Sequence, residues 1–184
     1  MIKTLTTEKY YHSKVNNDVC QEAFKFINEL NKNFTEQSWN CKIRTSFNIT
    51  DNILNEKELH SLKINILSHL DNYMHLNQQF FHGYIVTSWA NIYEKDFFQE
   101  KHTHEDSCSK HLSGIVYLTE NNSNLNLYSK SNPSEETPIK PEFSDIIIFE
   151  DDRPHSVSVN TNEDLRISLA FNYLLASEWK GKKH

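Results

Sequence analysis

"SDIIIFEDDRPHSVSVNTNEDLRISLAFN", residues 144–172, holds the clearest strand pattern in the chain. Apolar side chains follow one another from Ile146 to Phe149, and shorter alternating stretches begin at His155 and Arg166. A proline-containing turn and a polar loop separate these stretches. Because successive side chains of a strand point to opposite faces, we expect three short β-strands here.

The two-residue period extends back to about residue 81, whereas the earlier part of the chain has a helical period. Further strand candidates are "GYIVTSWANIYE", "SGIVYLTE" and "LNLYSK". Before them, "NDVCQEAFKFINELNKNF" and "NEKELHSLKINILSHLDNYM" place apolar residues three and four positions apart, which is typical of helices. The sequence therefore predicts a mostly β protein whose N-terminal helices pack outside a sandwich or barrel.

The length of 184 residues suits a single domain over residues 1–184, with a mainly helical flank at 1–80 and a β-core at 81–176. The formal charge is -6 and the basic residues are scattered, so a nucleic-acid-binding face is not expected. No apolar run approaches the roughly 20 residues of a membrane span, and the N-terminus lacks the apolar core of a signal peptide. Three widely spaced cysteines form neither a disulfide framework nor a zinc motif. We expect a cytoplasmic protein with reduced thiols.

"EKHTHED", residues 100–106, contains two overlapping pairs of potential metal ligands. His102 and His104 are two residues apart, and so are His104 and Asp106. On a strand, either pair points both side chains to the same face. His155, about 50 residues later, is the candidate for a third ligand. We therefore expect a mononuclear metal site that uses His104, His155 and one of the other two residues.

The strand that begins at Arg166 has a polar face. Arg166, Ser168 and Asn172 alternate with apolar residues and share that face. A cation, a hydroxyl and an amide are unfavourable in a core unless something anionic or polar lies against them. This pattern predicts a bound anionic or polar group at this strand.

The order of these residues resembles that of the iron(II)- and 2-oxoglutarate-dependent oxygenases, whose pattern is H-x-D, a distal His and R-x-S. The resemblance covers about residues 83–175. "DIIIFEDDRPHSVSV" followed by Arg166 is similar to a segment of the prolyl hydroxylases, and "SGIVYL" to their strand whose last tyrosine contacts 2-oxoglutarate. More narrowly, "SWANIYEKDFFQEKHTHEDS", "SGIVYL" and "RISLAFN" resemble a 2-oxoglutarate/Fe(II) oxygenase family of marine bacteria and their phages. The resemblance implies a double-stranded β-helix (jelly roll, cupin-like) over 81–176, with the metal near one mouth.

The resemblance also implies Fe(II) and 2-oxoglutarate, and it assigns roles to residues. Three protein ligands leave three positions on iron, two for 2-oxoglutarate and one for dioxygen. Arg166 would meet the distal carboxylate with paired hydrogen bonds, and Ser168 would add a hydroxyl. Tyr117 would line the cosubstrate pocket, and Asn91 and Tyr93 have a spacing similar to the asparagine and tyrosine that bind 2-oxoglutarate in AlkB-type demethylases. Further candidates for the pocket are Trp89, Ser113 and Asn172.

The identity of the remaining metal ligand is open between two residues. Chemistry favours Asp106, because the usual facial triad contains a carboxylate. Register favours His102, because Asn91 and Tyr93 then lie eleven and nine residues before the first ligand, and because the narrower family usually has H-x-H there. We rank His102 slightly above Asp106.

The expected function is the oxidation, by hydroxylation or a related reaction, of an unknown small-molecule or peptide substrate, with release of succinate and CO2 from 2-oxoglutarate. One competing hypothesis is a three-histidine iron dioxygenase that does not use 2-oxoglutarate. Another is a non-catalytic β-domain that binds a ligand or partner. The sequence identifies neither the substrate nor the oligomeric state.

Overall fold

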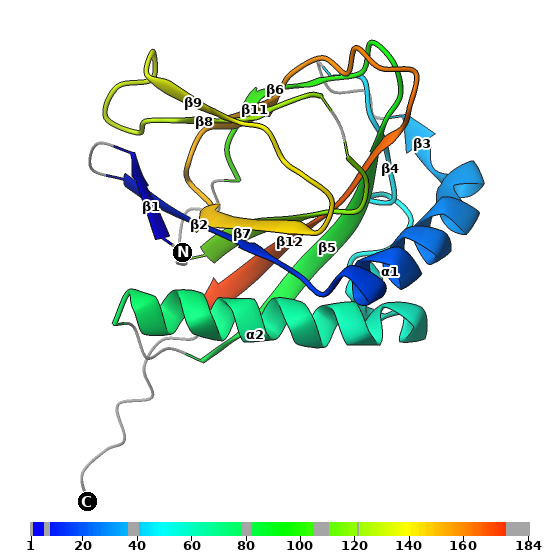
Figure 1. Cartoon of the computed structure of the whole chain (residues 1–184), viewed down its shortest axis with the longest axis horizontal. Coiled ribbons are helices and arrows are strands. Elements are labelled where there is room, and N and C mark those ends of the chain that lie inside the picture. Colours follow the sequence, from blue (N-terminus) through cyan, green and yellow to red (C-terminus); the bar gives the residue numbers. More distant parts are fainter. Residues whose placement is uncertain are drawn as a thin grey trace, which may run out of the picture.

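The computed structural model describes residues 2–5, 8–36, 41–78, 82–104, 111–120 and 122–175, and these form two sheets and a layer of helices (Figure 1). The larger sheet has the strand order β1-β2-β10-β7-β12-β5-β4-β3, and the smaller has the order β6-β11-β8-β9. The strands of the larger sheet are β1 (Ile2–Leu5), β2 (Glu8–Lys14), β3 (Thr35–Glu36), β4 (Arg44–Thr45), β5 (Gly83–Tyr93), β7 (His111–Tyr117), β10 (Asp145–Glu150) and β12 (Arg166–Leu175). Those of the smaller sheet are β6 (Gln99–His102), β8 (Leu125–Tyr128), β9 (Glu136–Ile139) and β11 (His155–Val157).

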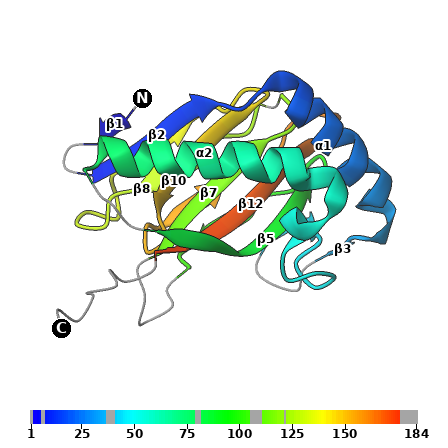
Figure 2. The same ribbon diagram turned by 90° about the horizontal axis from the view of Figure 1, so that it is seen from below.

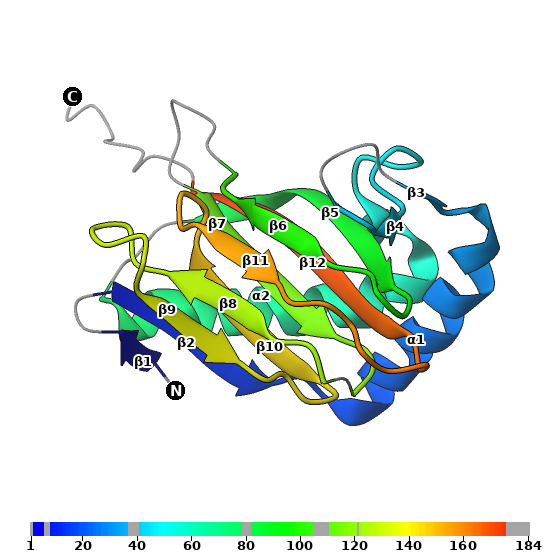
Figure 3. The ribbon, with the colours of Figure 1, turned by 90° about the horizontal axis from the view of Figure 1, so that it is seen from above.

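Helices cover one face of the larger sheet, and the smaller sheet covers the other. Figure 2 shows α1 (Asn17–Leu30) and α2 (His60–Leu76) across the first face, and Figure 3 shows the smaller sheet over the second. Short 3-10 helices, η1 (Asn31–Asn33), η2 (Ile53–Asn55) and η3 (Lys57–Leu59), flank the α-helices. The larger sheet is thus buried on both faces, as is expected when layers pack on each side of it.

The run "IIIF" in β10 follows from this two-sided burial. Ile146 and Ile148 pack into the cluster beneath the helices, whereas Ile147 and Phe149 pack into the cluster between the sheets. Strands that are buried on both faces lose the usual alternation of apolar and polar residues. Each such side chain stabilises the fold by roughly 1.5–3 kcal/mol through its burial.

The expected mostly β architecture with N-terminal helices is confirmed for the described residues, and both α-helices contain the apolar stripes predicted from the sequence. The flank at 1–80 differs from the expectation, because β1 and β2 precede the first helix and join the larger sheet. The sequence does not reveal β2, because neighbouring Tyr10 and Tyr11 are both buried, on opposite faces of the sheet. Neither described α-helix is long and apolar enough to cross a membrane.

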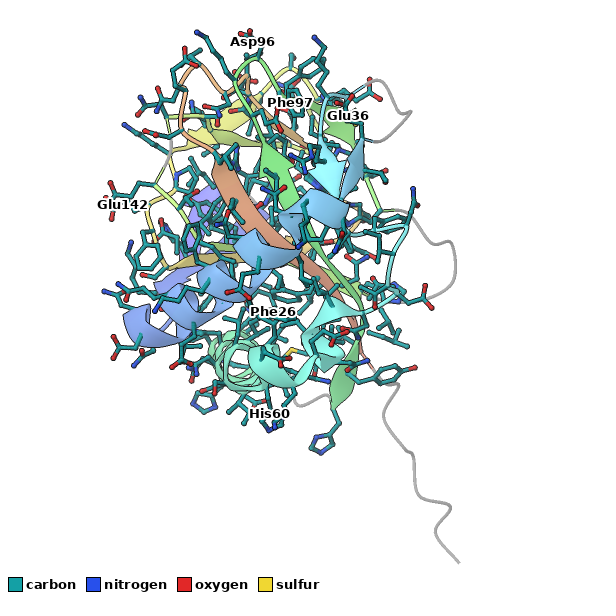
Figure 4. The ribbon with its side chains drawn as sticks, turned by 90° about the vertical axis from the view of Figure 1, so that its right-hand side faces the viewer. Phe26, Glu36, His60, Asp96, Phe97 and Glu142 are labelled. Carbon is teal, nitrogen blue, oxygen red and sulfur yellow. The ribbon has the colours of Figure 1, made fainter. Side chains whose placement is uncertain are left out.

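Helix α2 and the turn after β5 lie at opposite ends of the molecule (Figure 4). In the side view of Figure 4, His60 on α2 lies at the opposite end of the molecule from Asp96 and Phe97, which lie in the turn after β5. Phe97 packs there against a small apolar cluster that includes Tyr93 and Val157. The functional candidates described below lie between the sheets and not under the helices.

Candidate metal centre

The structure brings together three histidines from one end of the smaller sheet. His102 ends β6 and lies directly opposite His155, the first residue of β11. His104 follows β6, where its backbone N–H donates to the carbonyl of Asp151 (3.1 Å). One ring nitrogen from each histidine lies within 4.8 Å of the others. Asp106, the competing candidate to His102, lies outside the described residues.

Two of these histidines have a fixed tautomer. The Nδ1 of His102 lies 2.8 Å from the carbonyl oxygen of Glu100, and the Nδ1 of His155 lies 2.9 Å from that of Arg153. A carbonyl oxygen can only accept, so each Nδ1 carries the proton and each Nε2 keeps its lone pair. Metal-bound histidines in proteins are usually oriented in this way by a hydrogen bond from their second nitrogen.

The third histidine is held by side chains of the larger sheet. The Nδ1 of His104 lies 2.9 Å from the Ser113 hydroxyl oxygen and 3.1 Å from the Asn172 amide oxygen. The ring of Trp89 packs edge-on against it, at 5.8 Å between centroids. The sequence-predicted pocket residues Ser113, Asn172 and Trp89 therefore all contact His104, and its Nε2 also stays available.

Burial keeps the cluster neutral at pH 7. It lowers the pKa of His104 to about 4, with a smaller contribution from neighbouring His102. It also lowers the pKa of His155 well below the usual value, and that of His102 in the same direction. Desolvation disfavours the charged imidazolium, and metal ions bind only the neutral form. These three imidazoles are thus in the protonation state that a metal requires.

A buried arginine, two of whose nitrogens lack a hydrogen-bond partner among the described residues, lines the same cavity as the histidines. Arg166 is 1% exposed, and its Nε and Nη1 have no hydrogen-bond partner among the described residues. The rings of Tyr93 and Tyr117 lie 5.0 and 5.2 Å from the guanidinium. The Tyr117 hydroxyl is also buried without a hydrogen bond of good geometry to any described residue. Such a cation is unfavourable unless an anion joins it.

Arg166 and the three histidines lie around one inner cavity, and Tyr117 lies behind this lining, against the guanidinium of Arg166. The cavity wall also includes Ser168, which is 2% exposed and pairs with Asn91 and Tyr117 on the neighbouring strands. Burial raises the pKa of Tyr117 to about 12 despite the opposing charge of Arg166, so the phenol remains a hydrogen-bond donor. The unsatisfied guanidinium N–H groups of Arg166 and the phenol of Tyr117 are donors from which a carboxylate can accept hydrogen bonds. The cavity has a volume of only about 20 Å³, so side chains must move to admit a dicarboxylate.

Asn91 and Tyr93 lie at this cavity but already have protein partners. In the amide orientation that satisfies both of its atoms, Asn91 donates to the Thr45 hydroxyl (3.0 Å) and accepts from the Trp89 indole (3.2 Å). The Tyr93 hydroxyl donates to the amide oxygen of Gln99 (2.8 Å). Both residues line the cavity, and their polar side-chain groups are hydrogen-bonded to other protein residues, so their binding of 2-oxoglutarate stays a prediction.

Gln99 is a site residue that the sequence does not reveal. It is three positions before His102, and an odd separation puts two strand residues on opposite faces. Here β6 and β11 change register between the pairs His155–His102 and Val157–Gln99, so a separation of three positions on β6 matches one of two positions on β11. This bulge turns the Gln99 side chain toward His102, to 3.3 Å between the amide nitrogen and Nε2.

A wider cleft of about 380 Å³ adjoins the inner cavity. Ile43, Phe47 and Trp89 give its wall apolar surface, and the rings of Phe47 and Trp89 are in edge-to-face contact at 5.3 Å between centroids. His102 and His104 line both this cleft and the inner cavity. The arrangement provides two compartments that share the same histidines.

The model of the family described as the 2OG-Fe(II) oxygenase superfamily matches residues 88–174. This segment of the chain is similar to the 2OG-Fe(II) oxygenases. The matched segment contains every candidate site residue, from Trp89 to Asn172. Oxygenases of this family use Fe(II) and 2-oxoglutarate. The general resemblance inferred from the sequence is confirmed, and the narrower one to marine bacterial and phage proteins stays a prediction.

Solved structures of 2OG-Fe(II) oxygenases share this fold. A prolyl-4-hydroxylase from Pseudomonas putida is 15% identical, with a TM-score of 0.67 over 94% of this chain and 95% of that one. A prolyl hydroxylase from Trichoplax adhaerens, in complex with a hypoxia inducible factor peptide, is 13% identical, with a TM-score of 0.67 over 90% and 83%. The epimerase SnoN, in complex with Fe3+, alpha ketoglutarate and nogalamycin RO, is 10% identical, with a TM-score of 0.71 over 91% and 79%. No curated protein sequence matches the chain significantly.

Proposed function

We propose that this chain is an Fe(II)- and 2-oxoglutarate-dependent oxygenase that hydroxylates or otherwise oxidises a small-molecule or peptide substrate, releasing succinate and CO2. The observation that carries the proposal is the buried Arg166, whose unpaired atoms share a cavity with three neutral histidines. We further propose that the two sheets form a double-stranded β-helix and that residues 1–184 act as one domain.

The metal ligands in this proposal are His102, His104 and His155, each through Nε2. Their hydrogen bonds from Nδ1 orient the three rings, and their lowered pKa values remove competition from protons at pH 7. Fe(II), when bound together with 2-oxoglutarate, supplies the dioxygen chemistry. A set of three histidines departs from the H-x-D pattern, and it leaves the charge of the metal uncompensated by its protein ligands.

The distal carboxylate of 2-oxoglutarate would lie against Arg166, with Tyr117 and Ser168 as further donors. These groups are buried, so their charge-assisted hydrogen bonds are little weakened by water. The substrate would enter the wider cleft, where Trp89 and Phe47 supply aromatic surface. The structural neighbours bear names that mention a peptide and nogalamycin RO, and this supports either a peptide or a small-molecule substrate.

The proposal is tested by succinate release in the absence of any added substrate. Purified protein is loaded anaerobically with Fe(II) and 2-oxoglutarate and then exposed to oxygen. Slow formation of succinate by the wild type, and its loss in His155→Ala, is the expected result. Arg44→Ala, which changes an arginine of the larger sheet that is paired with Glu94 outside the cavity, should keep the succinate formation of wild type.

A second candidate is a three-histidine iron dioxygenase that does not use 2-oxoglutarate, and the observation that favours it is the cluster of three imidazoles. Iron binding without any consumption of 2-oxoglutarate would support this candidate. Failure to bind iron at micromolar concentrations would instead support a non-catalytic ligand-binding domain.

A further inference from the structure

We propose that Gln99 is a positioning residue that caps the metal-binding nitrogen of His102 in the metal-free protein and releases it when metal binds. The proposal rests on the function proposed above, because it concerns the same histidine. It adds a residue with a defined role in metal loading.

The hydrogen bonds around Gln99 leave one consistent arrangement. His102 gives its Nδ1 proton to the carbonyl of Glu100, so its Nε2 can only accept. The Gln99 amide nitrogen lies 3.3 Å from that Nε2 and donates to it. At the other end of the amide, the oxygen accepts from the Tyr93 hydroxyl at 2.8 Å. The reverse amide orientation would place oxygen against a lone pair, which is repulsive.

The lone pair of His102 therefore has two competing uses. A metal ion and the Gln99 N–H cannot share it, so metal binding must break this hydrogen bond. Among the described residues, no comparable donor reaches the Nε2 of His104 or His155, whose hydrogen bonds all involve Nδ1. The competition is thus confined to one of the three ligands.

Gln99 also lies at the boundary between the two compartments. It lines the inner cavity and the wider cleft, together with His102 and His104. Metal–ligand bonds of about 2.1 Å place neighbouring ligands of an octahedral ion about 3 Å apart. The 3.3 Å separation from His102 Nε2 is close to that value, so the end of side chain 99 lies within reach of a metal bound to His102.

Two substitutions at this position remove the amide donor, and only one of them adds a potential metal ligand. Gln99→Leu removes the competing donor and adds no ligand. Gln99→Glu also removes the donor, and it adds a carboxylate that can bind the metal. If the amide caps His102, Mn(II) should bind about three- to tenfold more tightly to the leucine variant than to wild type, which corresponds to one lost hydrogen bond. The glutamate variant should bind more tightly still.

The affinities are measured by anaerobic Mn(II) titration at pH 8 without 2-oxoglutarate, with folding checked by circular dichroism. Gln21→Leu and Gln21→Glu, on the exposed side of α1, make the same chemical changes away from the site and should leave the affinity unchanged. If Gln99→Leu does not fold, Gln99→Met keeps the length of the side chain and takes its place.

A leucine variant that binds Mn(II) as weakly as wild type or more weakly would overturn the proposal, as would a glutamate variant that binds less tightly than wild type. Both outcomes leave the proposed function intact, provided that wild type binds Mn(II) and His155→Ala does not. If wild type itself binds no metal, the proposed function fails and the role of Gln99 fails with it.

Discussion

In each histidine of the cluster, Nδ1 is hydrogen-bonded to a protein acceptor, and Nε2 is the nitrogen that we propose binds the metal. The Nδ1 atoms of His102, His104 and His155 all have protein acceptors, and one ring nitrogen of each histidine lies within 4.8 Å of the others. Neutral imidazoles fixed in one tautomer bind a metal without prior rearrangement of the rings. That these residues bind iron stays a prediction, and a test of it also distinguishes His102 from Asp106.

His102→Ala and Asp106→Ala should differ sharply in metal affinity. Loss of His102 removes one of three clustered ligands, so we expect at least a tenfold loss, by analogy with the roughly 10- to 100-fold effects of residues that only support a ligand. If Asp106 is not a ligand, Asp106→Ala should leave the metal affinity within about threefold of wild type. A change of that size is smaller than the tenfold loss, about 1.4 kcal/mol, that we expect for His102→Ala. Anaerobic Mn(II) titration measures both. The opposite ranking would make Asp106 the ligand and His102 a supporting residue.

At the level of the strands, β7 and β12 hold the polar groups of the site in register. Ser113 lies opposite Asn172, and Ser168 lies opposite Tyr117, so His104 and the cosubstrate pocket are built on the same strand pair. Between them, Gly114 lies against Phe171, whose ring a Cβ at position 114 would overlap. The absence of a side chain at Gly114 thus makes room for the ring of Phe171, which packs over β7 from the neighbouring strand β12.

Gly114→Ala should therefore destabilise the protein by about 1–3 kcal/mol, the usual range for an overpacked core. Urea denaturation measures this change. Adding Phe171→Leu should recover part of it, because the smaller side chain leaves room for the methyl group, so the double variant should lose less than the sum of the two single variants. Additive losses would show that the overlap with Phe171 is not the cause.

The elements also show which features could be predicted from sequence. The strand alternation of "RISLAFN" is enough to place Arg166, Ser168 and Asn172 on one face, and the spacing in "EKHTHED" gives the histidine pair. Gln99 could not be predicted, because it faces His102 only through a bulge that depends on pairing between β6 and β11. The aromatic wall formed by Phe47 and Trp89 also depends on long-range packing, because these residues are far apart in the chain.

At the scale of the whole molecule, the largest apolar cluster and the candidate metal site lie on opposite faces of the larger sheet. The apolar cluster under α1 and α2 fills one side of the larger sheet, and the polar site lies on the other side. The histidines on that side are buried (His155) or partly buried (His102 and His104) without charge, which links the stability of the metal-free protein to pH.

The metal-free protein should lose stability as the pH falls below about 6.5, the ordinary pKa of histidine in an unfolded chain. The folded pKa values are lower, about 4 for His104, so between these values the unfolded chain binds protons that the folded protein does not. Each such histidine contributes a slope of up to about 1.4 kcal/mol per pH unit, and the contribution is flat above pH 7. Urea denaturation at pH 7, 6 and 5 measures the slope, and His104→Gln should reduce it. An unchanged slope in that variant would refute the assignment.

The most direct test of the central claim is calorimetric titration of 2-oxoglutarate into Mn(II)-loaded protein without oxygen, comparing wild type with Arg166→Leu. The variant should bind 2-oxoglutarate at least tenfold more weakly, because charge-assisted hydrogen bonds to the distal carboxylate are lost, while its Mn(II) affinity stays within about threefold. Ser168→Ala should show a smaller loss, and Arg44→Leu should match wild type. Equal 2-oxoglutarate affinity in wild type and Arg166→Leu, or an equal loss of metal and 2-oxoglutarate binding, would contradict the account.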